Sequence, residues 1–272
     1  MRRRFFVEGF RGDAAVLSGD AASHLSRVLR AEAGQLYELS DGESVWLART
    51  EKVSRDEIHF ALVERLVVPA APVQIALLLA IVKFDRFEWA IEKATELGVD
   101  EIVPLQAGRS EPGLVAASAK RAQRWERILV ESAQQARRVR VPKLHGAEKS
   151  TDAFRAARAD VRLLLSERAG ARPMRALLEP SALELYPKNP AMVGIAIGPE
   201  GGWTDAEFSA AVDAGFSEAA LGSNILRTET AVCAALAAVQ YVFGAFRPDS
   251  GANTEIETQT PGSSGAQSRS VL

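Results

Sequence analysis

Apolar and polar positions in the first 68 residues follow the pattern of short β-strands separated by turns. One helix interrupts the strands, because apolar residues recur at helical spacing between Ala21 and Leu29, with Ser18 and Asp20 as alternative N-caps. Strands are expected at residues 5–7, 35–39, 44–48 and 58–63, with a turn at residues 41–42. Many short strands around one helix favour a small β-barrel.

A different pattern begins at Val73, after a connector that contains Pro69 and Pro72. Residues 73–82 form a near-continuous apolar run, typical of a strand covered on both faces, and the helical periodicity of residues 86–97 ends at Gly98. Further apolar strands are expected at residues 102–105, 161–165, 191–197 and 219–221, and a long amphipathic helix at residues 116–138. This alternation predicts an α/β domain with a mostly parallel sheet.

These patterns divide the chain into residues 1–70, residues 71–246 and a tail at residues 247–272. The tail is rich in Ser, Thr, Gly and Gln and has no apolar periodicity. Such a segment cannot bury enough apolar surface to offset the entropy of ordering it, so we predict that it is disordered.

Composition narrows the class of protein further. The 272 residues include a single cysteine, which excludes an intramolecular disulfide, and no Cys/His group has metal-ligand spacing. The apolar stretches fall short of the roughly 20 residues needed to cross a bilayer. The N-terminus also lacks the apolar core of a secretory signal. We therefore expect a soluble cytoplasmic protein with no metal and no membrane partner.

Residues 196–207 run from an apolar strand through a glycine-rich turn into a helix. Thr204 and Glu207 have the spacing of a capping box, which specifies where the helix starts. Gly198, Gly201 and Gly202 let the backbone approach a ligand closely, although a tight strand-to-helix connection explains the same glycines. No Gly-Lys-Ser/Thr follows and the spacing does not fit GxGxxG, so a nucleotide-phosphate site is disfavoured.

A second glycine turn, at Gly222, precedes a helix expected at residues 229–243, which Thr228 can cap. This helix is rich in alanine and apolar on almost every side, which predicts burial. Arg227 and Glu229 stand at its start and either pair with each other or face a ligand. Two glycine turns at neighbouring strand ends predict a crevice at the carboxyl edge of the sheet.

Short motifs along the chain match a known pattern. They lie at residues 3–7, 24–30, 93–99, 109–110, 124–125, 133–138, 197–202 and 221–231, and the last two are highly specific in order and spacing. Together they resemble the RsmE-type 16S ribosomal RNA uridine-N3 methyltransferases of the SPOUT superfamily. The resemblance covers about residues 1–246.

The resemblance implies a PUA-like RNA-binding β-barrel at residues 1–70 and a SPOUT α/β-knot methyltransferase domain at residues 71–246, working as a homodimer. It implies S-adenosylmethionine as methyl donor and N3 of a specific uridine in 16S rRNA of the small subunit as acceptor. By analogy, the donor pocket is lined by Leu165, Ser166, Glu167, Gly198, Pro199, Glu200, Gly201, Gly202, Leu221, Gly222, Ile225, Leu226 and Arg227.

The chemistry of this reaction suggests catalytic groups. Methyl transfer from a sulfonium is an in-line displacement, so the enzyme mainly positions donor and acceptor. Uridine N3 must lose its proton, and a nearby cation stabilises the developing anion. Arg227 and Arg109 are the candidates for that cation. Glu200 and Glu229 are the candidates for accepting the proton or orienting the base.

The near-balance of 33 basic and 35 acidic residues conceals two basic zones. Residues 1–30 hold six arginines against three acids, and residues 120–149 hold nine Lys/Arg against three. A solvated helix face explains such clusters, but beside a PUA-like domain we interpret Arg3, Arg4, Arg27, Arg30 and Arg138 as phosphate contacts. Two alternatives remain: a SPOUT protein with another RNA target, and a non-catalytic RNA-binding or assembly module.

Overall fold

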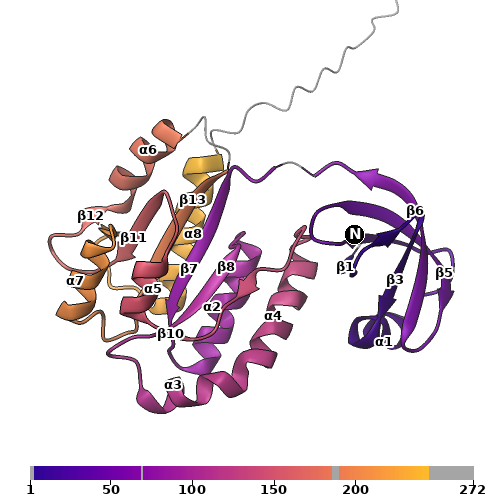
Figure 1. Ribbon diagram of the computed structural model, residues 1–272, viewed down its shortest axis with the longest axis horizontal. Coiled ribbons are helices and arrows are strands. Elements are labelled where there is room, and N and C mark those ends of the chain that lie inside the picture. The colour runs from indigo at the N-terminus through magenta and orange to yellow at the C-terminus, as the bar shows by residue number, and fades with distance from the viewer. Residues whose placement is uncertain (1–2, 69, 186–189, 245–272) are drawn as a thin grey trace, which may run out of the picture.

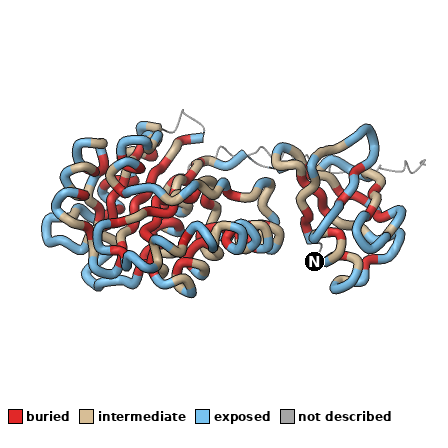
Figure 2. Tube along the Cα trace, turned by 60° about the horizontal axis from the view of Figure 1, so that its bottom comes forward, coloured by how far each residue is buried: buried red, intermediate tan, exposed pale blue. Residues whose placement is uncertain are grey.

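The computed structural model describes residues 3–68, 70–185 and 190–244, and these form two separate β-sheets (Figure 1). The predicted tail at residues 247–272 lies outside the described residues. The first sheet uses residues 4–66, and the second begins at residue 73, so the change of sheet falls in the proline-containing connector. Within these described ranges, buried residues gather around each sheet (Figure 2), with one hydrophobic cluster at the first sheet and two at the second.

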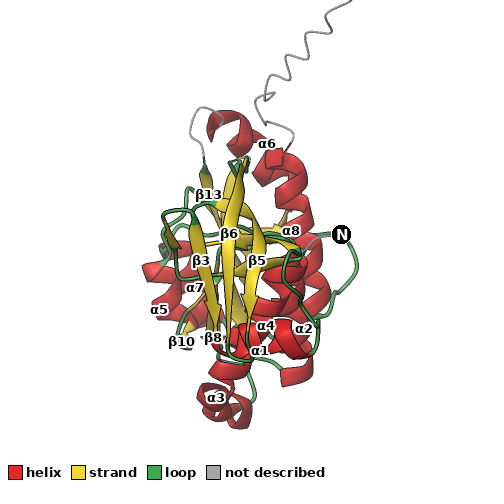
Figure 3. Cartoon of the chain, turned by 90° about the vertical axis from the view of Figure 1, so that its right-hand side faces the viewer, coloured by secondary structure: helices red, strands yellow, loops and turns green. Residues whose placement is uncertain are grey.

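The first sheet has six strands in the order β1-β4-β5-β6-β3-β2. The strands are β1 (Arg4–Phe6), β2 (Phe10–Arg11), β3 (Ala14–Ser18), β4 (Leu36–Ser40), β5 (Val45–Val53) and β6 (Glu57–Leu66), with α1 (Gly19–Arg27) after β3. β1 pairs parallel with β4 and the other pairs are antiparallel. Figure 3 views the molecule from the side of this sheet. Leu25 of α1 packs into its core with Phe5 and Phe60.

The second sheet has eight strands, and all of its pairings among the described residues are parallel, as the alternating pattern predicted. Its path is β10-β8-β7-β13-β11-β14-β12, with β9 beside β8. The strands are β7 (Val73–Ala80), β8 (Glu101–Gln106), β9 (Lys143–Leu144), β10 (Glu148–Lys149), β11 (Val161–Leu165), β12 (Arg172–Pro173), β13 (Ala191–Ile197) and β14 (Ser217–Ala220).

Helices cover both faces of this sheet, which is the α/β arrangement expected (Figure 1). The helices are α2 (Phe84–Glu96), α3 (Pro112–Ser118), α4 (Ala122–Gln135), α5 (Ser150–Ala156), α6 (Met174–Leu185), α7 (Asp205–Asp213) and α8 (Thr228–Gly244). Ile75 and Leu77 of β7 pack with α2 and α8 on one face, whereas Leu78 packs with α5 and α7 on the other. Burial of alternate residues on opposite faces explains the continuous apolar run.

Two helices differ from the sequence prediction. The helix expected at residues 116–138 is divided, because α3 leads through a 3-10 turn at Ala119–Arg121 into α4, which ends before Arg137 takes a positive φ of 53°. The prediction that α8 is buried all round is wrong for the described residues. Its inner face is buried at Val232 and Leu236, but Tyr241 on the outer face is 83% exposed.

The two sheets are joined by an ion cluster around the buried Glu38. Glu38 on β4 is 3% exposed and pairs with Arg4 on β1 and with Arg137, which follows α4. Arg4 also donates to the carbonyl of Arg137, and the Ser40 hydroxyl donates to the carbonyl of Val139 at 2.5 Å. These contacts attach the small sheet to the end of α4.

Candidate active site

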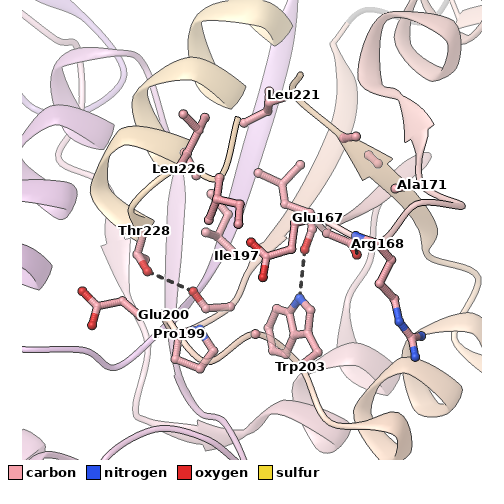
Figure 4. A pocket seen from close by; sticks show the side chains of 18 of the residues that line it. Glu167, Arg168, Ala171, Ile197, Pro199, Glu200, Trp203, Leu221, Leu226 and Thr228 are labelled. Atoms are coloured by element: carbon pink, nitrogen blue, oxygen red, sulfur yellow. Dashed lines mark hydrogen bonds between the residues drawn. The ribbon is translucent and has the colours of Figure 1, made fainter. Parts of the chain in front are cut away.

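A pocket of about 870 Å³ opens at the carboxyl ends of β11, β13 and β14, where the sequence predicted a crevice. Its walls are the loop after β11, the glycine turn after β13 and the segment between β14 and α8 (Figure 4). All thirteen residues expected around the donor, from Leu165 to Arg227, line it. Three chain segments far apart in sequence therefore meet at one site.

The glycine turn after β13 is held rigidly. The capping box is confirmed: Thr204 accepts from the Glu207 backbone, and the Glu207 carboxylate accepts from the Thr204 backbone. Gly202 has a φ of +70°, which L side chains rarely adopt. A β-carbon on Gly198 would come within 3.0 Å of the Trp203 ring. These glycines are thus required by the turn's conformation and its close packing.

Two hydrogen bonds join the pocket walls to one another, as the dashed lines in Figure 4 mark. The Trp203 indole N–H donates to the Leu165 carbonyl at 3.0 Å, and the ring is 4% exposed, so Trp203 is mainly a packing residue. The Thr228 hydroxyl donates to the Gly198 carbonyl at 3.1 Å. Thr228 is the first residue of α8, and its hydroxyl bonds to the glycine turn and not to the backbone of the helix. The expectation that Thr228 caps the helix is therefore not met.

A buried carboxylate supports the turn from behind. Glu207, 3% exposed, accepts from the Gly108 backbone at 2.8 Å and from the Ser150 hydroxyl at 2.5 Å, besides its bonds from Thr204. Burial raises the pKa of Glu207, but the hydrogen bonds outweigh burial and hold that pKa below its ordinary value. The network fixes the loop after β8, and with it Arg109, against α7.

Three of the four candidate catalytic residues line the pocket: Arg109, Arg227 and Glu200. Arg109 donates from Nη1 to the Gly201 carbonyl at 2.7 Å. Glu229 does not line the pocket, and its Oε2 is buried with no hydrogen-bond partner in the described part of the chain. Successive helical residues point about 100° apart, so Glu229 turns away from the side that Thr228 faces. We withdraw it as a proton acceptor.

The sequence reasoning missed Arg86. This residue lies in the first turn of α2, lines the pocket and forms an ion pair with Glu200. Its position just beyond the carboxyl end of β7 is the available signal, since β7 and β13 are neighbours and end at the same edge.

Two of the five proposed phosphate contacts are occupied by internal partners. Arg4 is 7% exposed within the Glu38 cluster. Arg138 pairs with Asp100 at 3.2 Å and donates to the carbonyls of Thr95 and Val99, and burial lowers its pKa. Both expectations are corrected, because these guanidinium groups join parts of the fold. Arg3, Arg27 and Arg30 are exposed.

Among the described residues, no helix is long and apolar enough to span a membrane. Within those same residues, no three His, Cys, Asp or Glu side chains gather as a metal site would require.

The fold and the pocket define an RNA methyltransferase. Residues 69–240 match the family described as an RNA methyltransferase domain. The ribosomal RNA small subunit methyltransferase E of Mycobacterium bovis is 31% identical over 236 residues, covering 84% of this chain and 86% of that protein. The chain therefore belongs to the ribosomal RNA small subunit methyltransferase E family, which confirms the resemblance seen in its motifs.

Two solved structures of methyltransferases are similar to this chain over most of its length. The crystal structure of a ribosomal RNA small subunit methyltransferase E from Neisseria gonorrhoeae, bound to S-adenosyl methionine, superposes with a TM-score of 0.78 at 28% identity, covering 89% of this chain and 98% of that chain. A putative methyltransferase from Legionella pneumophila, in complex with the same cofactor, has a TM-score of 0.77 at 30% identity, with the same coverage.

Proposed function

We propose that the protein transfers a methyl group from S-adenosylmethionine to N3 of a specific uridine in 16S rRNA of the small ribosomal subunit. The observation that carries this function is the convergence of the expected donor residues on one pocket at the ends of β11, β13 and β14. The family to which the chain belongs supports the same reaction.

The residues present fit this donor. Leu221, Ile225 and Leu226 offer apolar surface for an adenine, and the backbone of the glycine turn offers hydrogen-bonding groups for adenine and ribose. The donor has no phosphate, so the absence of a phosphate-loop signature is consistent with it. When bound, it supplies a methyl group made electrophilic by a sulfonium.

The protein's own residues position the acceptor and stabilise its charge. We assign Arg109 and Arg227 to the anion that develops at N3 as its proton leaves, because both are exposed cations on the pocket wall. Arg109 is fixed by Gly201, and Arg227 has no hydrogen bond or ion pair from its side chain in the described structure. Glu200, paired with Arg86, is the acidic candidate left in the pocket for accepting the N3 proton or orienting the base.

The family also guides our proposal for the remaining architecture. We propose that residues 1–70 form a PUA-like barrel that binds RNA, and that residues 71–246 form a trefoil-knotted SPOUT domain in a cytoplasmic homodimer. Trp89 on α2 and Tyr241 on α8 are 44% and 83% exposed and lie on helices that pack together. Exposed aromatic side chains on adjoining helices are suited to an interface between two copies.

The RNA surface that we propose uses Arg3, Arg27 and Arg30. Each is exposed on the small sheet domain, and Arg30 holds a positive φ of 52°. Phosphate contacts of this kind make affinity fall with salt, so RNA binding should depend steeply on salt concentration.

Nucleoside mass spectrometry of small-subunit rRNA, with and without the gene, tests the proposed function. We expect N3-methyluridine to disappear without the gene and to return with the wild-type chain. An unchanged profile would refute the assignment, and loss of another methylated nucleoside would point to a different RNA target.

A further inference from the structure

The loop after β11 places one carboxylate in the pocket. Glu167 follows Ser166 at the end of the strand, and its side chain reaches toward the middle of the pocket on the side of Ile197 (Figure 4). A β-carbon built on Gly202 would lie 3.9 Å from Glu167 Oε1. The carboxylate therefore lies beside the glycine turn that we propose holds the donor.

Glu167 differs from the other acidic residues of the pocket in having no partner. Glu200 pairs with Arg86, and Asp205 pairs with Arg168 at 2.9 Å. The Arg168 guanidinium also stacks on the Phe208 ring at 3.9 Å, which keeps that pair on the outer wall. Within the described structure, the Glu167 side chain has no hydrogen bond and no ion pair. Its negative charge is available to a ligand.

A free carboxylate in this position suits the charge of the donor. S-adenosylmethionine carries a sulfonium cation, and transfer of the methyl group leaves a neutral thioether, so the pocket's ligand loses one positive charge in each turnover. An opposite charge at short range in a partly enclosed site favours the charged ligand over the neutral one. A carboxylate here therefore favours donor over product.

We propose that Glu167 is a specificity-determining residue that recognises the positive charge of the donor and so lets the protein discriminate S-adenosylmethionine from its demethylated product. The proposal rests on the proposed cofactor and goes beyond it, because it concerns the relative affinity of two ligands. It assigns Glu167 a role in exchanging product for donor, without a part in the chemical step.

Isothermal titration of the full chain tests the proposal, with S-adenosylmethionine, S-adenosylhomocysteine and the cationic analogue sinefungin as ligands. Glu167→Gln keeps the size of the side chain and removes its charge. We expect the Kd of both cationic ligands to rise about three- to tenfold, whereas that of the neutral product changes less than about twofold. Glu167→Asp keeps the charge and should keep the ratio of the two Kd values closer to the wild-type ratio.

Glu64→Gln is the matched control, because Glu64 is an exposed acid on β6 outside the pocket. It should leave all three affinities unchanged. An unchanged donor-to-product ratio in Glu167→Gln would overturn the proposal, and so would an equal loss for all ligands, which would indicate a role in shape alone. If the wild-type chain bound neither donor nor product, the cofactor assignment itself would fail, which is a distinguishable result.

Discussion

Replacement of Glu207 by Gln tests whether the glycine turn depends on its buried support. The carboxylate accepts four hydrogen bonds: from the backbone N–H groups of Gly108 and Thr204 and from the hydroxyls of Ser150 and Thr204. The hydroxyls can rotate to accept from the new amide, but the two backbone N–H groups face different carboxylate oxygens. One of them therefore meets an amide NH₂ and loses its acceptor.

The expected loss of stability follows from these four hydrogen bonds. An orphaned buried N–H costs about 1–3 kcal/mol, and the other bonds lose the strengthening that the charge gave them. We expect Glu207→Gln to lower the free energy of unfolding by about 3 kcal/mol, measured by urea denaturation at pH 7. Ser150→Ala, which removes one donor, should cost about 1 kcal/mol. A loss below about 1 kcal/mol in Glu207→Gln would refute the reasoning.

The pH dependence gives the same prediction a second readout. The pKa of Glu207 in the folded protein lies below its ordinary value of 4.5, so the carboxylate stabilises the fold fully above that pH. The stabilisation is lost as the pH falls through the folded pKa. The gap between wild type and Glu207→Gln should therefore narrow below pH 4.5. If the difference in free energy of unfolding between the two proteins widened at low pH, the pKa of Glu207 could not lie below its ordinary value.

Four further predictions use other parts of the molecule. Gly98→Ala should destabilise the fold by about 1–3 kcal/mol in thermal unfolding, because φ is +94° and a β-carbon would meet Gln240 at 2.6 Å. Glu38→Gln should cost about 3 kcal/mol in urea unfolding, because it leaves the buried Arg4 and the more exposed Arg137 without their carboxylate. The double variant Arg27→Ala/Arg30→Ala should reduce the slope of log affinity for RNA against log salt by about 1.4. An unchanged slope would show that neither arginine contacts an RNA phosphate. Arg227→Ala should lower kcat about 100-fold with the donor Kd little changed, and an equal loss in both would make it a donor-binding residue.

Local signals made the strands and helices of the second sheet readable from the sequence. The apolar run at residues 73–82 and the capping box at Thr204 and Glu207 each depend on near neighbours, and both are present in the structure. The division of the helix expected at residues 116–138 was not readable, since Ala119 and Lys120 carry no strong helix-breaking signal.

Long-range partners explain where residue-level predictions were wrong. Arg4 and Arg138 look like free cations in sequence, but their partners Glu38 and Asp100 lie 34 and 38 residues away. Arg86 was missed for the same reason, because its pairing with Glu200 joins two strand ends that are adjacent only in the folded sheet. The residues expected around the donor line one pocket, because their motifs stand at the ends of neighbouring strands, and their contact with the donor stays a prediction.

The central claim is methyl transfer to uridine N3, and purified protein tests it most directly. Small ribosomal subunits from a strain without the gene are incubated with the protein and methyl-labelled S-adenosylmethionine, and the 16S rRNA nucleosides are then separated by mass spectrometry. The account predicts label in N3-methyluridine at a single position. Label in any other nucleoside, or no incorporation by a protein that binds the donor, would contradict it.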